Sequence, residues 1–233
     1  MPHPEPLVLL PGMMCDARLF APQVAALSAE RAVMVAPIHH HDTTAALADA
    51  VLAAAPARFA LAGLSMGGIV AMEVVARAPG RVTRLACLDT NSEAERAEVA
   101  ARRGPQMEKV AAGGLRAVMR DEMKPNYLAD GPDRGAILDL CMAMAEALGP
   151  EAFARQSRAL IARPDRRATL RAFPRPVLAL CGAEDALCPV HRHETIAGLA
   201  PDAELVVIEG AGHLPTLERP EETTAALRGW LAR

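Results

Sequence analysis

Short apolar runs alternate with helix-like patterns along most of this chain, and the alternation restricts the folds open to it. Strands that are apolar on both faces form the interior of parallel sheets, which helices cover on both sides. The sequence therefore predicts an α/β fold with a mostly parallel sheet of about six strands. The runs are LVLL (7–10), AVMVA (32–36), FALAG (59–63), LACLD (85–89), VLALCG (177–182) and ELVVIEG (204–210). Helices are predicted at about 17–29, 43–55, 66–78, 189–199 and 221–232.

Residues 92–172 interrupt this alternation, because they contain no convincing strand and are patterned as several helices separated by glycine and proline. Their composition is neither repetitive nor rich in proline and serine, which argues against a linker. We therefore expect one α/β core, formed by residues 1–91 and 173–233, into which residues 92–172 are inserted as a helical cap.

Charge and composition exclude several classes of partner. The formal net charge is -3, and the 25 basic residues are scattered among 28 acidic ones without a basic stripe, which favours neither nucleic acid nor a membrane surface as partner. No apolar run reaches the roughly 18 residues of a membrane-spanning helix, and the opening MPHPEP lacks the regions of a signal peptide. A cytoplasmic protein is expected. The five cysteines are an odd number without regular spacing, typical of reduced thiols.

The pentapeptide Gly63-Leu64-Ser65-Met66-Gly67 matches the G-x-S-x-G pattern of a nucleophile elbow. It follows a predicted strand and precedes a predicted helix, where a sharp turn presents the serine hydroxyl near the N-terminus of that helix. A serine at this place can also simply cap the helix. Cys15 and Cys188 are alternative nucleophiles, but no motif surrounds either one and packing explains them better.

A serine nucleophile needs a base and a carboxylate, and both follow later strands. His213 lies in GAGHLP after the sixth run, and Asp185 lies in CGAED after the fifth. Carboxyl ends of parallel strands meet at one edge of the sheet, so these side chains are predicted to approach Ser65. The order Ser65, Asp185, His213 is that of an α/β-hydrolase triad. Asp89 is a second candidate for the acid, although a turn or capping role explains it equally well.

Four motifs in this order make the chain resemble the α/β-hydrolase superfamily, in particular small capped carboxylesterases and the pimeloyl-carrier-protein methyl esterase group. They are LLPG, GLSMGG, GAED and GAGHLPTLERPEE, and the resemblance covers nearly the whole chain. It implies an oxyanion hole formed by the backbone N–H groups of Met13 and Met66. Two departures stand out: the first loop lacks the usual His-Gly, and the first strand begins by Leu7, which leaves no room for the opening antiparallel hairpin.

Histidine and methionine clusters give weaker signals. The run His39-His40-His41 lacks ligand partners at metal spacing and is predicted to be a loop at the pocket rim, with no metal bound. His191 and His193 are expected to be solvated on a surface helix. Several of the 11 methionines are core or pocket candidates, and in a pocket they would form a flexible apolar wall. The predicted substrate-binding residues are Met14, Met119, Met123 and Met142.

The sequence thus predicts a serine hydrolase that cleaves an ester or thioester of a small to medium apolar acyl group through an acyl-enzyme, without metal or organic cofactor. Its expected partner is a small-molecule substrate, and its expected assembly is a monomer or homodimer. Because fold and triad do not fix the reaction, carbon–carbon bond hydrolysis, a lyase step and perhydrolysis remain alternatives. So does a ligand-binding module that keeps the triad without turnover.

Overall fold

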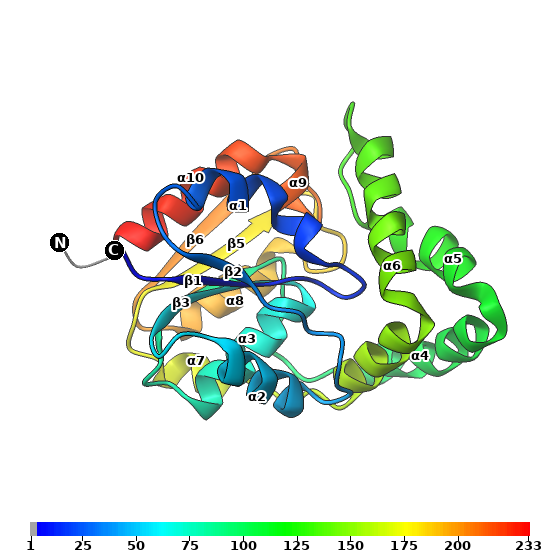
Figure 1. Ribbon diagram of the computed structural model, residues 1–233, viewed down its shortest axis with the longest axis horizontal. Coiled ribbons are helices and arrows are strands. Elements are labelled where there is room, and N and C mark those ends of the chain that lie inside the picture. Colours follow the sequence, from blue (N-terminus) through cyan, green and yellow to red (C-terminus); the bar gives the residue numbers. More distant parts are fainter. Residues whose placement is uncertain (1–3) are drawn as a thin grey trace.

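Six parallel strands form one sheet in the order β2-β1-β3-β4-β5-β6. The computed structural model describes residues 4–233 (Figure 1), so the first three residues of MPHPEP lie outside the described residues. The predicted α/β class and six-stranded parallel sheet are confirmed. The strands are β1 (Leu7–Leu10), β2 (Val33–Val35), β3 (Phe59–Leu64), β4 (Val82–Leu88), β5 (Val177–Gly182) and β6 (Ala203–Ile208).

Helices cover both faces of this sheet, as expected for strands that are apolar on both sides. On one face α1 contacts α9 and α10, and on the other α2, α3, α7 and α8 pack in succession (Figure 1). Alternate residues of β1 serve the two cores: Leu7 and Leu9 belong to one cluster, and Val8 and Leu10 to the other. The bounds are α1 (Ala21–Leu27), α2 (Thr44–Ala54), α3 (Met66–Arg77), α7 (Arg167–Ala172), α8 (Val190–Leu199), α9 (Pro215–Glu218) and α10 (Pro220–Ala232), and a 3₁₀ turn, η1 (Ala17–Phe20), precedes α1.

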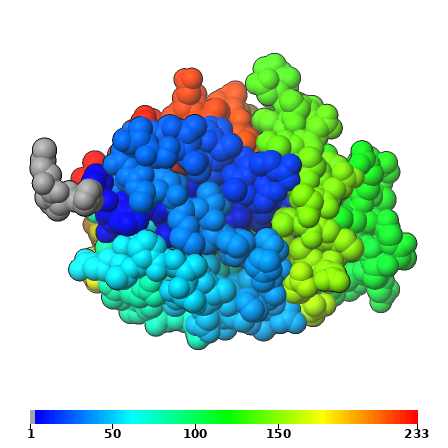
Figure 2. All heavy atoms as spheres, viewed as in Figure 1, coloured from blue at the N-terminus to red at the C-terminus, as the bar shows by residue number. Residues whose placement is uncertain are grey.

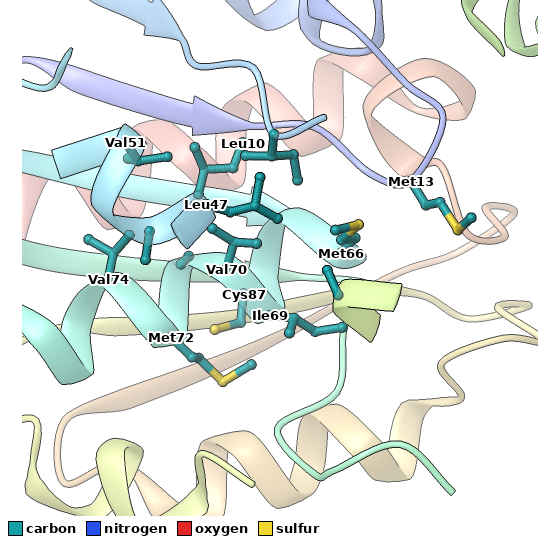
Figure 3. Packing of buried hydrophobic residues seen from close by; sticks show 14 of the residues in the cluster. Leu10, Met13, Leu47, Val51, Met66, Ile69, Val70, Met72, Val74 and Cys87 are labelled. Carbon is teal, nitrogen blue, oxygen red and sulfur yellow. The ribbon is translucent and has the colours of Figure 1, made fainter. Parts of the chain in front are cut away.

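Close packing joins α2 and α3 to the sheet. Figure 3 shows Leu47 and Val51 of α2 beside Val70 and Val74 of α3, with Leu10 of β1 against them. Each of these side chains is at most 1% exposed. Since burial of such a side chain contributes about 1.5–3 kcal/mol, this layer fixes α3, and with it the residue before α3, firmly on the sheet.

Between β4 and β5 the chain leaves the sheet and forms helices that stand at one end of the strands (Figure 1, green). Figure 2 shows them closing against the blue N-terminal part of the chain. A kink lies at Gly149, where φ is 78° and a proline follows, which removes a helical hydrogen bond. The elements are α4 (Ala97–Lys109), η2 (Val110–Gly114), α5 (Leu115–Ala117), η3 (Val118–Met123), η4 (Lys124–Asn126) and α6 (Arg134–Ile161).

The last helix of the predicted cap range packs with the core. Helix α7 contacts α3 and α8, whereas α6 contacts both α4 and α5 at the end of the sheet. We keep the name insertion helices for α4 to α6. None of the helices in residues 4–233 is both long and apolar enough to cross a membrane.

Candidate active site

Ser65 occupies the sharp turn between β3 and α3. Its φ of 55° lies in the left-handed region, and its side chain makes no capping hydrogen bond to the helix that it precedes. The backbone is held instead: the Ser65 N–H donates to the Leu88 carbonyl at 2.8 Å, and the Thr90 hydroxyl donates to the Ser65 carbonyl at 2.7 Å. The hydroxyl of this strained residue is therefore left for another partner.

Two glycines make the turn possible. A Cβ on Gly63 would lie 2.2 Å from the Gly67 carbonyl oxygen, and one on Gly67 would lie 2.0 Å from the Leu10 carbonyl oxygen. Both distances are far below van der Waals contact, and the opposing atoms are backbone. The G-x-S-x-G pattern thus reflects close backbone approach, which holds Ser65 directly beside β1.

His213 and Asp185 complete a hydrogen-bonded chain with Ser65. The Ser65 hydroxyl lies 2.9 Å from His213 Nε2, and His213 Nδ1 lies 2.8 Å from Asp185 Oδ2. With Asp185 ionised, Nδ1 carries the proton and Nε2 is left to accept from the serine hydroxyl. Asp89 makes a different bond, since its Oδ1 accepts from the Gly182 N–H at 2.9 Å.

Several neighbours favour the charged form of Asp185. Burial alone would raise its pKa, but the adjacent His213 and the N–H groups of Cys188 and Leu187 outweigh that effect, so the pKa is lowered. Both N–H groups donate to Oδ1, at 3.0 Å and 2.8 Å, and leave Oδ2 for the imidazole. The carboxylate is therefore fixed in position and held anionic.

Met13 and Met66, whose backbone N–H groups are the predicted oxyanion donors, line the same cavity as Ser65. Met66 begins α3, and Met13 lies in the loop after β1 (Figure 3). A Cβ on the preceding Gly12 would be 3.5 Å from Ser65 Cβ, so this loop runs beside the serine. Within residues 4–233 neither N–H group has a hydrogen-bond partner. Both are therefore available to an oxygen bound next to Ser65.

Comparison with known proteins accounts for this arrangement. The profile of the family described as "Alpha/beta hydrolase family" matches residues 7–227. The chain belongs to the alpha/beta hydrolase family. A pimeloyl-[acyl-carrier protein] methyl ester esterase of Aromatoleum aromaticum is 31% identical over 194 residues, which cover 77% of this hydrolase and 76% of that protein.

Solved structures agree with the family. A thermophilic esterase from Thermogutta terrifontis, with malate bound, matches the hydrolase with a TM-score of 0.91 at 29% identity, covering 98% of this chain and 89% of the other. The enol-lactonase from Burkholderia xenovorans shares the fold, with a TM-score of 0.89 at 24% identity over 98% and 92% of the two chains. The present chain is therefore an enzyme of the α/β-hydrolase type.

Gln156 of helix α6 is a residue that sequence analysis missed. Its side chain is fully buried, accepts from the Met14 N–H at 2.9 Å and donates to the Ile38 carbonyl at 3.0 Å. It thereby ties α6 to the loop that carries Met13, where Met14 has a φ of 56°. A glutamine 142 residues away in a long helix gives no sign of this contact in the sequence.

Glu218, also missed, holds the loop that carries His213. Its carboxylate accepts from the N–H groups of Gly212 and Leu214, which flank His213, at 3.0 Å each, and from Ala129 at 2.8 Å. Burial raises the pKa of Glu218, although these N–H groups oppose the effect. The only sequence signal is its place in GAGHLPTLERPEE, five residues after His213.

A cavity of about 480 Å³ adjoins the Ser65 hydroxyl, and its walls differ from the expected apolar one. Met13, Met66 and Met123 line it. Met14, Met119 and Met142, predicted to bind substrate, do not: they are 1%, 1% and 7% exposed and belong to a buried core cluster. Helical spacing alone does not distinguish a core-facing methionine from a cavity-facing one.

The run His39-His40-His41 lies away from the cavity, which corrects the predicted rim position. The His39 carbonyl accepts from Arg155 of α6 at 2.9 Å, and none of the three histidines lines the cavity. The loop is part of the contact between the core and the insertion helices. Its polar composition resembles that of a rim because the loop borders solvent on its other side.

Two cysteines near the site have thiols that resist ionisation. Burial raises the pKa of Cys15 and of Cys188 well above the usual value, and nearby acidic groups add to the effect. Cys188, Asp185 and His213 have ligand atoms within 4.8 Å of one another. However, Asp185 and His213 are already hydrogen-bonded together, and a neutral thiol is a poor metal ligand. These thiols fit a packing role better than a nucleophilic one.

His193 corrects a further expectation, because its side chain is fully buried rather than solvated. Its Nε2 accepts from the N–H of Thr90 at 2.9 Å, and Thr90 is the residue whose hydroxyl donates to the Ser65 carbonyl. Burial lowers the pKa of His193 to about 4. The imidazole is therefore neutral in the folded enzyme at physiological pH.

Replacement of His193 is expected to change how stability depends on pH. The unfolded histidine titrates near pH 6.5 and therefore binds more protons than the folded one between about pH 4 and 6.5, so stability is lost as the pH falls through this window. The wild type should lose roughly 2 kcal/mol more of its free energy of unfolding between about pH 7 and pH 5 than His193→Gln, which keeps an acceptor for Thr90. Urea titrations at both pH values measure the difference.

His191→Gln is the matched control, since His191 lies two positions earlier on the same helix and is exposed. It should keep the wild-type pH dependence. Equal slopes for the wild type and His193→Gln would show that His193 is not the neutral buried group described here.

Proposed function

We propose that the protein is a serine hydrolase that cleaves carboxylic esters through an acyl-enzyme, with Ser65 as nucleophile, His213 as base and Asp185 as the acid. The observation that carries the proposal is the hydrogen-bonded chain of these three side chains, with lengths of 2.9 Å and 2.8 Å, built on a serine whose hydroxyl caps nothing. The named esterases among its relatives support an ester as the bond cleaved.

The first half-reaction forms the acyl-enzyme. Ser65 Oγ attacks the ester carbonyl carbon while His213 Nε2 takes its proton, and the anionic Asp185 stabilises the resulting imidazolium. The carbonyl oxygen becomes an oxyanion that accepts from the N–H groups of Met13 and Met66. When the carbon–oxygen bond breaks, the imidazolium returns the proton to the departing alkoxide, which leaves as an alcohol.

The second half-reaction repeats these steps with water. His213 takes a proton from water as the water oxygen attacks the acyl carbon. When the bond from that carbon to Ser65 Oγ breaks, the imidazolium returns the proton to Oγ, which releases the carboxylic acid and restores Ser65 and the neutral His213. Thioesters react by the same path, with a thiolate as the leaving group. Every proton transfer is made by side chains of this chain.

The insertion within residues 92–172 serves in this proposal as the cap. Met123, Asn126 and Tyr127 come from it and line the cavity with Ser65 and His213. The Tyr127 carbonyl also accepts from the His213 N–H at 2.6 Å, which joins the insertion to the loop of the base. A movement of these helices would therefore alter access to Ser65 and the position of His213 together.

A panel of p-nitrophenyl esters with acyl chains from two to about ten carbons, assayed beside acyl-thioesters of the same lengths, tests the proposal. We expect turnover of at least one ester, with saturation kinetics and a burst of p-nitrophenol when deacylation is slow. A single burst without turnover would indicate a ligand-binding module instead. Absence of both burst and turnover would overturn the proposed function.

A further inference from the structure

The cavity beside Ser65 has a strongly basic lining. Among residues 4–233, the cavity is lined by five arginines and by only one acidic side chain, that of Glu95. They are Arg96, Arg102, Arg103, Arg163 and Arg192. The chain as a whole is slightly acidic, with a net charge of -3, so this concentration of positive charge is local. A cavity for apolar acyl groups does not require it.

Two of these arginines share one carboxylate at the wall of the cavity. Glu95 Oε2 lies 2.7 Å from Arg103 Nη2, and Glu95 Oε1 lies 3.1 Å from Arg163 Nη2. The side chains of Glu95, Arg163 and Arg103 are 5%, 8% and 13% exposed, so the group is largely removed from bulk water. Two guanidinium groups and one carboxylate leave one positive charge without a partner. An unpaired charge at a buried position is unfavourable because it has lost the stabilisation that water provides.

Arg192 brings a third guanidinium to the same wall. It pairs with Glu93, which also faces Arg167 at 3.5 Å. Arg167 also pairs with Asp165 at 2.5 Å, so the charges at Glu93 are balanced, unlike those at Glu95. The backbone carbonyl of Glu93 accepts from Arg163 at 3.0 Å. The acidic residues therefore position these arginines without neutralising all of them.

The basic wall lies within reach of the reaction centre. Arg103 Nη1, which does not contact Glu95, lies 3.6 Å from the Met13 sulfur. Met13 follows Gly12, which lies beside Ser65, and is the residue proposed to donate its N–H to the oxyanion. The Met13 side chain therefore links the Arg103 guanidinium to the loop that runs beside Ser65.

We propose that these arginines, centred on Arg103 and Arg163, bind a carboxylate carried by the ester substrate. The proposal rests on the proposed function and narrows its substrate class to esters with a free carboxylate, such as monoesters of short dicarboxylic acids or esters of hydroxy acids. Arginine presents paired N–H donors that match the two oxygens of a carboxylate. The bound carboxylate would neutralise the one positive charge of Arg103 and Arg163 that Glu95 does not neutralise.

The matched test compares esters that differ by a single carboxylate group. On the acyl side, mono-p-nitrophenyl glutarate is compared with p-nitrophenyl butyrate; on the alcohol side, 4-(butyryloxy)benzoate is compared with phenyl butyrate. We expect kcat/KM to favour the anionic member of at least one pair by roughly 10–100-fold, because a hydrogen bond to a charged group has about that effect. The pair that shows the preference identifies the side of the ester that meets the arginines.

Arg103→Gln tests the residues themselves. Glu95 keeps Arg163 as its partner in this variant, so no buried carboxylate is left unpaired. The ratio of kcat/KM for the anionic ester to kcat/KM for the neutral ester should fall at least about tenfold. Arg158→Gln is the control, since Arg158 is an exposed arginine of α6 that pairs with Asp42 and does not line the cavity; it should keep the wild-type preference.

A measurement on the wild type avoids any question of folding. Glutarate should inhibit hydrolysis of p-nitrophenyl butyrate competitively, and pentane-1,5-diol, which has the same chain length without charge, should not. Rising salt should weaken the glutarate inhibition. Equal kcat/KM within both ester pairs, or equal inhibition by the diol, would overturn the inference while leaving the serine hydrolase intact; failure to cleave any ester would overturn the proposed function itself.

Discussion

Ser65→Ala is expected to lower kcat/KM for any ester substrate by at least about 10³-fold, because the proposed nucleophile is lost. Alanine keeps the Cβ of serine and places no new atom in the turn, so the melting temperature should change little. A fluorophosphonate, which phosphonylates an activated serine, should add one adduct per chain to the wild type and none to the variant. Intact-mass spectrometry measures the adduct, and circular dichroism verifies the fold.

Ser28→Ala provides the control for this experiment. Ser28 follows α1, is exposed, and lies outside the cavity, so its variant should react with the probe as the wild type does. Labelling that persists in Ser65→Ala would assign the activated hydroxyl to another residue. Undiminished ester hydrolysis by that variant would exclude the acyl-enzyme on Ser65.

The sheet was predictable because its strands are apolar on both faces. Runs such as FALAG and VLALCG correspond to β3 and β5, which are buried at every position, and no soluble surface strand has that pattern. The same physics located Ser65, Asp185 and His213, since each follows a strand and parallel strands end at one edge. The local hydrophobic pattern and the position along the chain were therefore sufficient to predict the sheet and the three side chains that meet at its edge.

The supports of the site were not predictable, because they are single polar residues that meet partners far away in sequence. Gln156 contacts Met14 across 142 positions, and Glu218 contacts Ala129 across 89. His193 has Arg192 and Glu194 on either side, so the sequence resembles an exposed helix there even though the imidazole faces Thr90. Burial of a polar side chain depends on tertiary contacts that no local window contains.

The basic wall of the cavity was hidden for a related reason. Helix α4, which carries Arg102 and Arg103, is polar overall and has no buried residue, so its sequence resembles that of any solvated helix. Only its placement over Ser65 shows that part of this polar face meets the cavity. The cavity is therefore lined by charged side chains, although an apolar lining was expected, because tertiary packing and not local composition decides which residues face it.

Two buried carboxylates lie at the strand ends near His213, and the structure distinguishes their states. Asp89 is fully buried with a φ of 43°, and burial raises its pKa well above the usual range, with the charge of Asp185 adding to the effect. The pKa of Asp185 is lowered. The protonated form is thus favoured at Asp89, which binds the Gly182 N–H, and the anionic form at Asp185, which faces the imidazole.

Asp185→Asn is accordingly expected to lower kcat by roughly 10³–10⁴-fold with little change in melting temperature. The amide is isosteric with the carboxylate, but an amide N–H2 facing His213 selects the tautomer with its proton on Nε2, which then no longer accepts from Ser65. Asp89→Asn should lower kcat by at most about tenfold, because an amide resembles the neutral acid and its oxygen still accepts from Gly182. Steady-state kinetics of both variants on one ester gives the ranking.

The pair of variants separates an orienting charge from a buried polar contact. A loss of packing would lower the melting temperature and would affect both residues, whereas loss of the orienting charge lowers kcat at Asp185 alone. Because the anion fixes the imidazole tautomer, Asp185→Asn should retain stoichiometric binding of substrate even as turnover fails, so KM should change far less than kcat. If Asp89→Asn proved the more damaging substitution, the acid would have to be reassigned to the end of β4, and His213 would have to turn away from the geometry described here.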